Sequence, residues 1–195
     1  MRVLFVCEAN RSRSPVAAAI WTRELTRLGI PASASSAGTH ALPDERASHQ
    51  MLWAAARHGL DLAEHRSRPL DDATVDAAHL ILTMTREQAD HVGMHHRRVS
   101  DRMFLVGELA ALLRIDEHTE PLAATAPLPA PTGTTTHVIT ATRLADLLTA
   151  AHARRLMRGI QDDDVTEPGE DPTAVEATIT RLTTDVTTIT THLTG

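Results

Sequence analysis

The chain opens on one informative segment, Val3-Leu4-Phe5-Val6-Cys7-Glu8-Ala9-Asn10-Arg11-Ser12-Arg13-Ser14-Pro15. Its first four residues are wholly apolar, which is typical of a strand buried on both faces of a parallel sheet. Residues 7–14 are mostly polar, and Pro15 holds a favoured position in the first turn of a helix. Apolar residues then recur at helical spacing as far as Gly29, namely Ala17, Ile20, Trp21, Leu25 and Leu28. A strand, a polar loop and a helix in this order predict the opening of a βαβ unit.

The polar loop has the composition of a phosphate-binding site. Between a strand and a helix, successive backbone N–H groups can point at one anion, with the positive end of the helix dipole behind them. The same field stabilises a thiolate, so Cys7 is predicted to be a nucleophile, and Ser14 can donate a hydrogen bond to it. The guanidinium fork of Arg13 matches two phosphate oxygens. The bland alternative is a buried cysteine in an ordinary strand-to-helix turn. The predicted phosphate-binding residues are Glu8, Ala9, Asn10, Arg11, Ser12 and Ser14.

The alternation of strands and helices continues along the chain. We expect further strands at 32–39, 79–84 and 103–106, and helices at 44–58, from 85, from 108, at 141–158 and at 175–193. This order favours a parallel sheet covered on both faces. The predicted fold class is therefore α/β, a three-layer sandwich with a four-stranded parallel sheet flanked by helices. Residues 1–195 are expected to form one domain with a Pro/Ala/Thr-rich insertion at about 116–137, where the periodicity fails.

Composition excludes several classes of function. A net charge of −6 argues against a nucleic-acid surface and against attachment to anionic lipid, so neither nucleic acid nor a membrane is an expected partner. The N-terminal apolar run is too short for a signal peptide or a membrane span, which favours a cytoplasmic location. A single cysteine, Cys7, rules out an internal disulfide and a cysteine-rich metal site. His91 and His95 have helical i, i+4 spacing but no evident third ligand, so no metal and no cofactor are predicted.

The run from Val3 to Pro15 resembles the signature of the low-molecular-weight protein-tyrosine phosphatases: a cysteine, five residues, an arginine and a serine directly after the first strand. Further matches follow in the family order at 36–39 (SAGT), 65–68 (HRSR) and 81–85 (ILTMT). The resemblance implies a four-stranded parallel sheet and a phosphate monoester hydrolase with a cysteinyl-phosphate intermediate. It implies a phosphorylated protein or a small phosphate ester as substrate. It also implies that Asn10 supports the strained loop by bonding Ser36 and His65.

A general acid must protonate the leaving oxygen, and a carboxylic acid on a mobile loop usually supplies that proton. The family uses an Asp-Pro pair before its final helix, and two pairs in this sequence are similar to it. Glu167-Pro168 has the better spacing, whereas Asp171-Pro172 keeps the dipeptide but lies almost against the helix. The predicted order is Glu167, then Asp171, then Asp164. A solvated acidic loop without catalytic function is the alternative.

The sequence departs from the family pattern mainly around the pocket. Ser12 replaces the second loop cysteine, and Glu8 and Arg11 replace residues that are commonly apolar. The aromatic wall is missing, with Leu42 and Gly169 near the expected rim, which predicts weak or unselective action on phosphotyrosine. Two other functions stay open: an arsenate reductase that relies on an external small thiol, and a non-catalytic phosphate-binding module. The natural substrate and the oligomeric state stay open as well.

Overall fold

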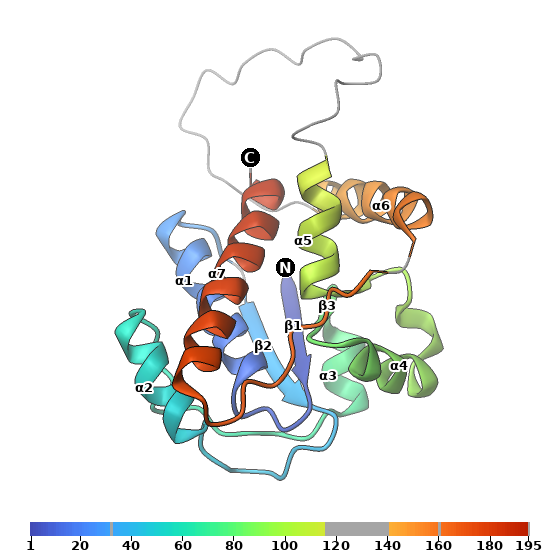
Figure 1. Ribbon diagram of the computed structural model, residues 1–195. Helices are drawn as coiled ribbons and strands as arrows, with labels where there is room; N and C mark the ends of the chain where they lie inside the picture. The colour runs from blue at the N-terminus through green and yellow to red at the C-terminus, as the bar shows by residue number, and fades with distance from the viewer. Residues whose placement is uncertain (32, 116–140, 160, 195) are drawn as a thin grey trace.

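The structure is a computed structural model, and it describes residues 1–31, 33–115, 141–159 and 161–194. A four-stranded parallel sheet lies between two layers of helices (Figure 1). The strands are β1 (Arg2–Cys7), β2 (Ser33–Gly38), β3 (Leu80–Thr83) and β4 (Met103–Leu105), and their order in the sheet is β2-β1-β3-β4. The predicted three-layer α/β architecture and all four predicted strands are confirmed. The predicted insertion at 116–137 lies outside the described residues.

The helices are α1 (Arg13–Arg27), α2 (His49–Arg57), α3 (Asp72–Ala77), α4 (Arg86–His95), α5 (Val106–Arg114), α6 (Ala141–Arg158) and α7 (Pro172–Thr194), with a short 3-10 turn at Arg97–Val99. The predicted bounds of α6 agree with the structure. The predicted start of α2 at residue 44 is wrong, because Ser48 caps the helix by accepting from the Met51 amide. Asp44 has a left-handed φ of 67°, which no helix accommodates. The six-residue α3 was not expected from the sequence.

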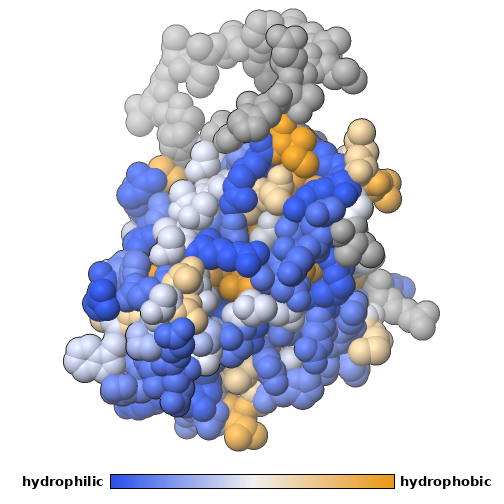
Figure 2. Space-filling model, in the orientation of Figure 1, coloured by the Kyte–Doolittle hydropathy of each residue, from blue (hydrophilic) through white to orange (hydrophobic). Residues whose placement is uncertain are grey.

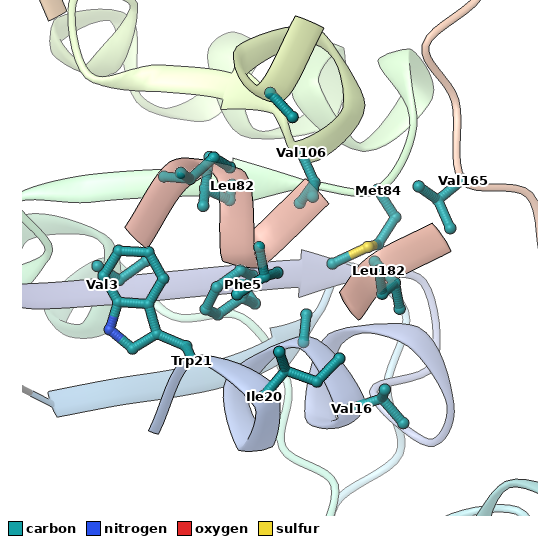
Figure 3. Packing of buried hydrophobic residues seen from close by; sticks show 14 of the residues in the cluster. Val3, Phe5, Val16, Ile20, Trp21, Leu82, Met84, Val106, Val165 and Leu182 are labelled. Atoms are coloured by element: carbon teal, nitrogen blue, oxygen red, sulfur yellow. The ribbon is translucent and has the colours of Figure 1, made fainter. Parts of the chain in front are cut away.

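β1 is buried on both faces because it lies at the interior of the sheet. Its odd-numbered residues, including Phe5, face the larger core, which α1, α2, α5, α6 and α7 complete. The ring of Trp21 meets Phe5 edge to face with centroids 5.9 Å apart. Figure 3 shows Val16 and Ile20 of α1 and Leu182 of α7 in the same core. The even-numbered Leu4 and Val6 face a smaller core under α3 and α4.

The threonine-rich α7 packs as its spacing predicts. Its buried apolar residues are Val175, Ile179, Leu182, Val186, Ile189 and Leu193. Threonine is a poor helix former, so the burial of this stripe, rather than intrinsic propensity, stabilises the helix. Several threonine hydroxyls donate to the carbonyl four residues earlier, as Thr184 does to Thr180 at 3.1 Å. The buried stripe packs against α1 and α5.

The surface is mostly polar. Figure 2 shows a largely hydrophilic face with small, separate hydrophobic patches. The exposed large hydrophobic side chains come from different elements and include Leu42, Trp53, Met94, Leu156 and Met157. Within the described part of the chain, no helix is both long enough and apolar enough to cross a membrane.

Candidate active site

The loop that connects β1 to α1 lies at the carboxyl end of the sheet, where open α/β sheets usually bind ligands (Figure 1). Cys7 ends β1 and is buried, with 1% of its surface exposed. Its Sγ lies 2.9 Å from Ser14 Oγ. Asn10 Nδ2 donates to Ser14 Oγ at 2.9 Å, so the serine hydrogen can point either to the sulfur or to the Ala37 carbonyl, which lies 3.4 Å away. This arrangement places a hydroxyl group within hydrogen-bond distance of the Cys7 sulfur.

The amino terminus of α1 adds a positive field at the same loop. Ser12 is the N-cap residue, yet its side chain makes no capping hydrogen bond, and the first turn has no acidic residue. The helix dipole is therefore not compensated by its own sequence and can act on a bound anion. The Ser12 hydroxyl instead lies 3.3 Å from the Ser48 hydroxyl at the start of α2.

Asn10 is the centre of the loop's support. It has a left-handed φ of 54°, a conformation that costs roughly 1–3 kcal/mol for a residue other than glycine. Its Nδ2 donates to Ser36 Oγ at 2.9 Å as well as to Ser14, and its Oδ1 accepts from the Arg68 amide at 3.0 Å. Its carbonyl lies 2.7 Å from His65 Nε2. The structure thus brings together Asn10, Ser36 and His65, which are distant in sequence.

The surroundings of His65 favour its neutral form. Burial lowers the pKa of its imidazole, which outweighs the opposite effect of the hydrogen bond to the Asn10 carbonyl, and the nearby Arg68 and Arg66 lower the pKa further. A neutral imidazole that donates from Nε2 to a carbonyl carries its hydrogen on that nitrogen. Arg68 also donates from Nε to the Ser36 carbonyl at 2.7 Å. The sequence reasoning named Arg68 only as a marker of the motif, and the structure gives it two contacts at the support of the loop.

The turn after β2 closes over the back of the loop. The Thr39 amide donates to the Cys7 carbonyl and the His40 amide to the Glu8 carbonyl, both at 3.0 Å. Gly38 leaves the space for this approach, because a Cβ at this position would lie 2.3 Å from the Glu8 carbonyl oxygen. A side chain at residue 38 is therefore incompatible with the observed loop. The sequence alone assigns no function to Gly38, because the close approach of two backbone segments cannot be recognised from a sequence pattern.

Arg13 connects this loop to the segment at 161–171, called the acid loop below. The Arg13 side chain is 2% exposed and donates from Nη1 to the Val165 carbonyl at 3.0 Å. Its Nε lies 2.6 Å from Glu167 Oε2, but the N–H is not aligned with that oxygen, so the contact is an ion pair and not a hydrogen bond. The Glu167 side chain is 43% exposed, which leaves it free to leave this contact.

The two other candidate acids are occupied at helix ends. Asp164 Oδ1 accepts from the Arg86 amide at the start of α4 at 2.9 Å. Asp171 Oδ1 accepts from the Thr173 amide at the start of α7 at 3.1 Å. Both are the ordinary capping interactions of acidic residues at helix amino termini. Among the three candidates, Glu167 is the one that contacts Arg13.

At the rim, the two charged residues of the loop behave differently. Glu8 and Ala9 are exposed. Arg11 turns toward the segment before α2, donating from Nε to the Arg46 carbonyl at 3.0 Å and pairing with Glu45 at 3.5 Å. The sequence reasoning placed both charges at the mouth. In the structure Glu8 is exposed, whereas the Arg11 guanidinium is bound to the segment before α2.

The histidine pair on α4 is not arranged around a common point. The rings of His91 and His95 lie 4.8 Å apart at their centroids, and His95 Nδ1 is 2.8 Å from the His91 carbonyl. Across the residues that the structure describes, no group of three or more histidine, cysteine, aspartate or glutamate side chains is placed to hold a metal.

Comparison with known proteins places this geometry in a family. Residues 2–119 match the family model described as "Low molecular weight phosphotyrosine protein phosphatase". A probable low molecular weight protein-tyrosine-phosphatase, EpsP of Ralstonia nicotianae, is 32% identical over 122 residues, which are 63% of this chain and 81% of that protein. A protein-arginine-phosphatase of Bacillus subtilis is 31% identical over 108 residues, which are 55% of this chain and 71% of that protein.

Solved structures agree on the fold. The low molecular weight protein tyrosine phosphatase of T. tengcongensis superposes with a TM-score of 0.69 at 21% identity, covering 98% of each chain. The YwlE arginine phosphatase, in a C7S mutant with a phosphorylated active-site serine, superposes with the same TM-score and identity, covering 99% of this chain and 95% of that one. Together with the match of the family model to more than half of the sequence, these likenesses show that the chain belongs to the low molecular weight phosphotyrosine protein phosphatase family.

Proposed function

We propose that this protein hydrolyses phosphate monoesters through a cysteinyl-phosphate intermediate on Cys7. The observation that carries the proposal is the buried Cys7 sulfur at the start of the phosphate loop, 2.9 Å from the Ser14 hydroxyl, with the buried Arg13 closing the same loop. A reactive thiolate is needed only for covalent chemistry, so this geometry favours an enzyme over a binding module. The single cysteine suits a reducing compartment, which is consistent with the predicted cytoplasmic location.

When substrate binds, its phosphate group replaces the Glu167 carboxylate as the anion beside Arg13. In the absence of substrate, the Glu167 carboxylate pairs with the Arg13 guanidinium. A phosphate dianion held by the loop amides offers Arg13 a stronger, bidentate partner. Glu167 is then displaced toward the leaving group, and the nearby dianion favours its protonated form by like-charge repulsion. The same contact that orders the acid loop at rest thus prepares the general acid.

In the first step, the Cys7 sulfur donates an electron pair to phosphorus and the bond from phosphorus to the leaving oxygen breaks. Glu167 gives its proton to that oxygen, so the leaving group departs neutral. The loop amides and Arg13 stabilise the charge on the three non-bridging oxygens as the transition state forms. In the second step, water attacks phosphorus, its proton passes to the Glu167 carboxylate, and the S–P bond breaks to regenerate the thiolate.

A phosphorylated protein is the substrate class that the family suggests. Within it, phosphoarginine is a second candidate beside phosphotyrosine, since two similar relatives are protein-arginine-phosphatases, from Bacillus subtilis and Geobacillus stearothermophilus. The rim supports a polar group, because the exposed carboxylate of Glu8 could meet a guanidinium and no tyrosine exists in the chain to build an aromatic wall. The same rim suits small polar phosphate esters.

Three variants test the mechanism with p-nitrophenyl phosphate and vanadate. We expect Cys7→Ser to abolish turnover but keep measurable vanadate binding, and Arg13→Ala to lose both. Arg27→Ala, which removes a surface ion pair at the other end of α1, is the matched control and should retain activity. Hydrolysis by Cys7→Ser near the wild-type rate would refute the covalent mechanism.

A fourth variant, Glu167→Gln, tests the assignment of the general acid. Glu167→Gln should slow release of a poor leaving group, such as phenol, by about 10²–10⁴-fold, and of 2,4-dinitrophenol much less. Single-turnover release should be measured, since it isolates the first step. Small, equal losses for both esters would transfer the function to Asp171, Asp164 or water.

Thiol-dependent formation of arsenite from arsenate, without ester hydrolysis, would establish the reductase instead.

A further inference from the structure

Two arginines hold the start of the acid loop: Arg158 of α6 and Arg181 of α7. Arg158, the last residue of α6, forms a two-pronged ion pair with Asp163: Nη1 to Oδ2 at 2.5 Å and Nη2 to Oδ1 at 2.9 Å. Both side chains are largely buried, with 22% and 10% of their surfaces exposed. The hydrogen bonds that Arg158 donates to Asp163 also raise the pKa of the Arg158 guanidinium. This planar, paired geometry fixes direction as well as distance.

Arg181 of α7 holds the backbone of the same segment. It donates from Nη2 to the Asp163 carbonyl at 3.0 Å and from Nη1 to the Asp164 carbonyl at 2.8 Å. Its Nε lies 3.7 Å from the Asp185 carboxylate one turn along α7, which keeps the guanidinium in place. Two consecutive carbonyls of the acid loop are therefore bound to one rigid helix.

The first turn of α5 completes the attachment. A Cβ on Gly107 would lie 2.5 Å from the Asp163 carbonyl oxygen and 2.9 Å from Arg181 Nη2. The backbone of α5 thus touches the attachment point directly, with no room for a side chain between them. The attachment point is built from three helices, α5, α6 and α7, and we call it the loop clamp: Gly107, Arg158, Asp163 and Arg181.

The clamp controls where the catalytic carboxylate can reach. Two residues after Asp163, Val165 is buried, donates its amide to the Met84 carbonyl at 2.7 Å and accepts from Arg13 at 3.0 Å. Figure 3 shows its side chain beside Met84 and Leu182 in the core. Glu167 follows only two residues later, so its backbone lies within roughly 7 Å of that fixed point. The acid loop is thus anchored on one side of Glu167, while the carboxylate itself remains half exposed.

We propose that Arg158 and Arg181 are positioning residues for the general acid, and that docking of α6 on the core is a condition for efficient proton donation. The inference rests on the proposed function of Glu167. α6 lies beyond residues 2–119, which match the family model, and it is attached to α5 through Arg155, both of whose bonds to Glu108 measure 2.7 Å. The helix therefore acts on the reaction through its last residue, Arg158, and not through contact with the substrate.

The test compares Arg158→Met with the matched control Arg27→Met, which removes a surface ion pair at the far end of α1. For Arg158→Met we expect single-turnover release of phenol to fall by about 10–100-fold, since a displacement near 1 Å costs about 10²-fold, with KM changed less than threefold. Hydrogen exchange at the Val165 amide should rise at least about tenfold. Arg27→Met should leave both quantities unchanged.

A double variant separates positioning from general damage. In the Glu167→Gln background, Arg158→Met should cause less than about a twofold further loss, because two changes that remove the same interaction are not additive. A full additional loss, or unchanged Val165 exchange with unchanged phenol release, would overturn the proposal. If Arg158→Met does not fold, Arg158→Lys keeps the charge, removes the fork and is subject to the same criteria.

The two proposals fail in different ways. The release of phenol and 2,4-dinitrophenol by Glu167→Gln can show that Glu167 is not the acid. In that case, the rate of leaving-group release no longer reports on the clamp. Val165 exchange and vanadate affinity then decide it, because the Val165 carbonyl contacts Arg13 and a released loop should weaken vanadate binding. Unchanged exchange and unchanged vanadate affinity in Arg158→Met would refute the clamp whatever Glu167 does.

Discussion

Replacing Gly38 by alanine should strongly lower the activity of the enzyme, because the new side chain would displace the backbone of the phosphate loop. A Cβ at this position would lie 2.3 Å from the Glu8 carbonyl oxygen and 2.9 Å from the Asn10 amide nitrogen, whereas ordinary contact begins at 3.4 Å. The Glu8 carbonyl must therefore retreat by the difference between 3.4 and 2.3 Å, about 1.1 Å, and Glu8 directly follows Cys7, the proposed nucleophile. Misplacement of this size lowers rates by about 10²-fold.

The effect on stability should be smaller than the effect on catalysis. Overpacking typically costs about 1–3 kcal/mol, and each kcal/mol lowers Tm by about 2–4 °C in a chain of this size. We therefore expect Gly38→Ala to fold, with a Tm lower by about 2–12 °C. The assay is kcat/KM for p-nitrophenyl phosphate at a temperature well below the reduced Tm, together with the melting curve.

Gly93→Ala is the matched control for this change. Gly93 lies inside α4, and its nearest neighbour to a new Cβ is Met103 Cε at 3.8 Å, an ordinary contact. Alanine should stabilise the helix by about 0.5–1 kcal/mol and leave kcat/KM unchanged. If Gly38→Ala keeps kcat/KM within about threefold of the wild type, then the loop tolerates a displacement of its second residue and the geometric reasoning is wrong.

Three further outcomes follow from the site. Asn10→Ala should lower kcat/KM by about 10²-fold and weaken vanadate binding, because it removes three side-chain hydrogen bonds that hold a left-handed residue, and unchanged kinetics would contradict this support. Burial lowers the pKa of His65 in the folded state, so the unfolded state binds more protons; stability is retained above the unfolded value of 6.5 and is lost as pH falls below it. The free energy of unfolding in urea, measured between pH 7.5 and 5.5, should depend less on pH in His65→Gln than in the wild type. Equal pH dependence in the two proteins would exclude His65 as the source. Phosphotyrosine peptides should be preferred over small polar phosphate esters only modestly, since aromatic contacts contribute about 0.5–1.5 kcal/mol that this rim lacks, and Glu8→Gln should reduce kcat/KM for phosphoarginine peptides more than for phosphotyrosine peptides; a thousandfold preference for phosphotyrosine would refute this view of the rim.

The sequence by itself determined the local elements of the site. An apolar run that ends at Cys7, a polar loop and a proline in the next helical turn specify a strand, an anion-binding loop and a helix through interactions within about a dozen residues. The spacing of the apolar residues in α7 likewise predicted a helix, although this segment is rich in threonine. Periodicity could be read here because each element buries one continuous face, and burial imposes its own spacing on the chain.

Other features depended on contacts that no local pattern encodes. Three carboxylates, Asp164, Glu167 and Asp171, fit the expected acid, and packing assigned the first and last to helix ends. The start of α2 moved to His49 because the preceding segment pairs with the phosphate loop, where the Ser48 amide donates to the Arg11 carbonyl at 2.9 Å. The orientation of Arg11 away from the mouth has the same origin.

Tertiary structure alone decided how the two halves of the site meet. Arg13 and Val165 are 152 positions apart in the chain, and their hydrogen bond exists because α1, α5 and α7 pack on one face of the sheet. The loop clamp depends on similar packing, since α5, α6 and α7 each supply one residue that holds Asp163 of the acid loop. Sequence periodicity reports which face of an element is buried, whereas the partner of that face is set by shape and volume in the folded core, where Arg13 becomes buried and Glu167 stays within reach of it.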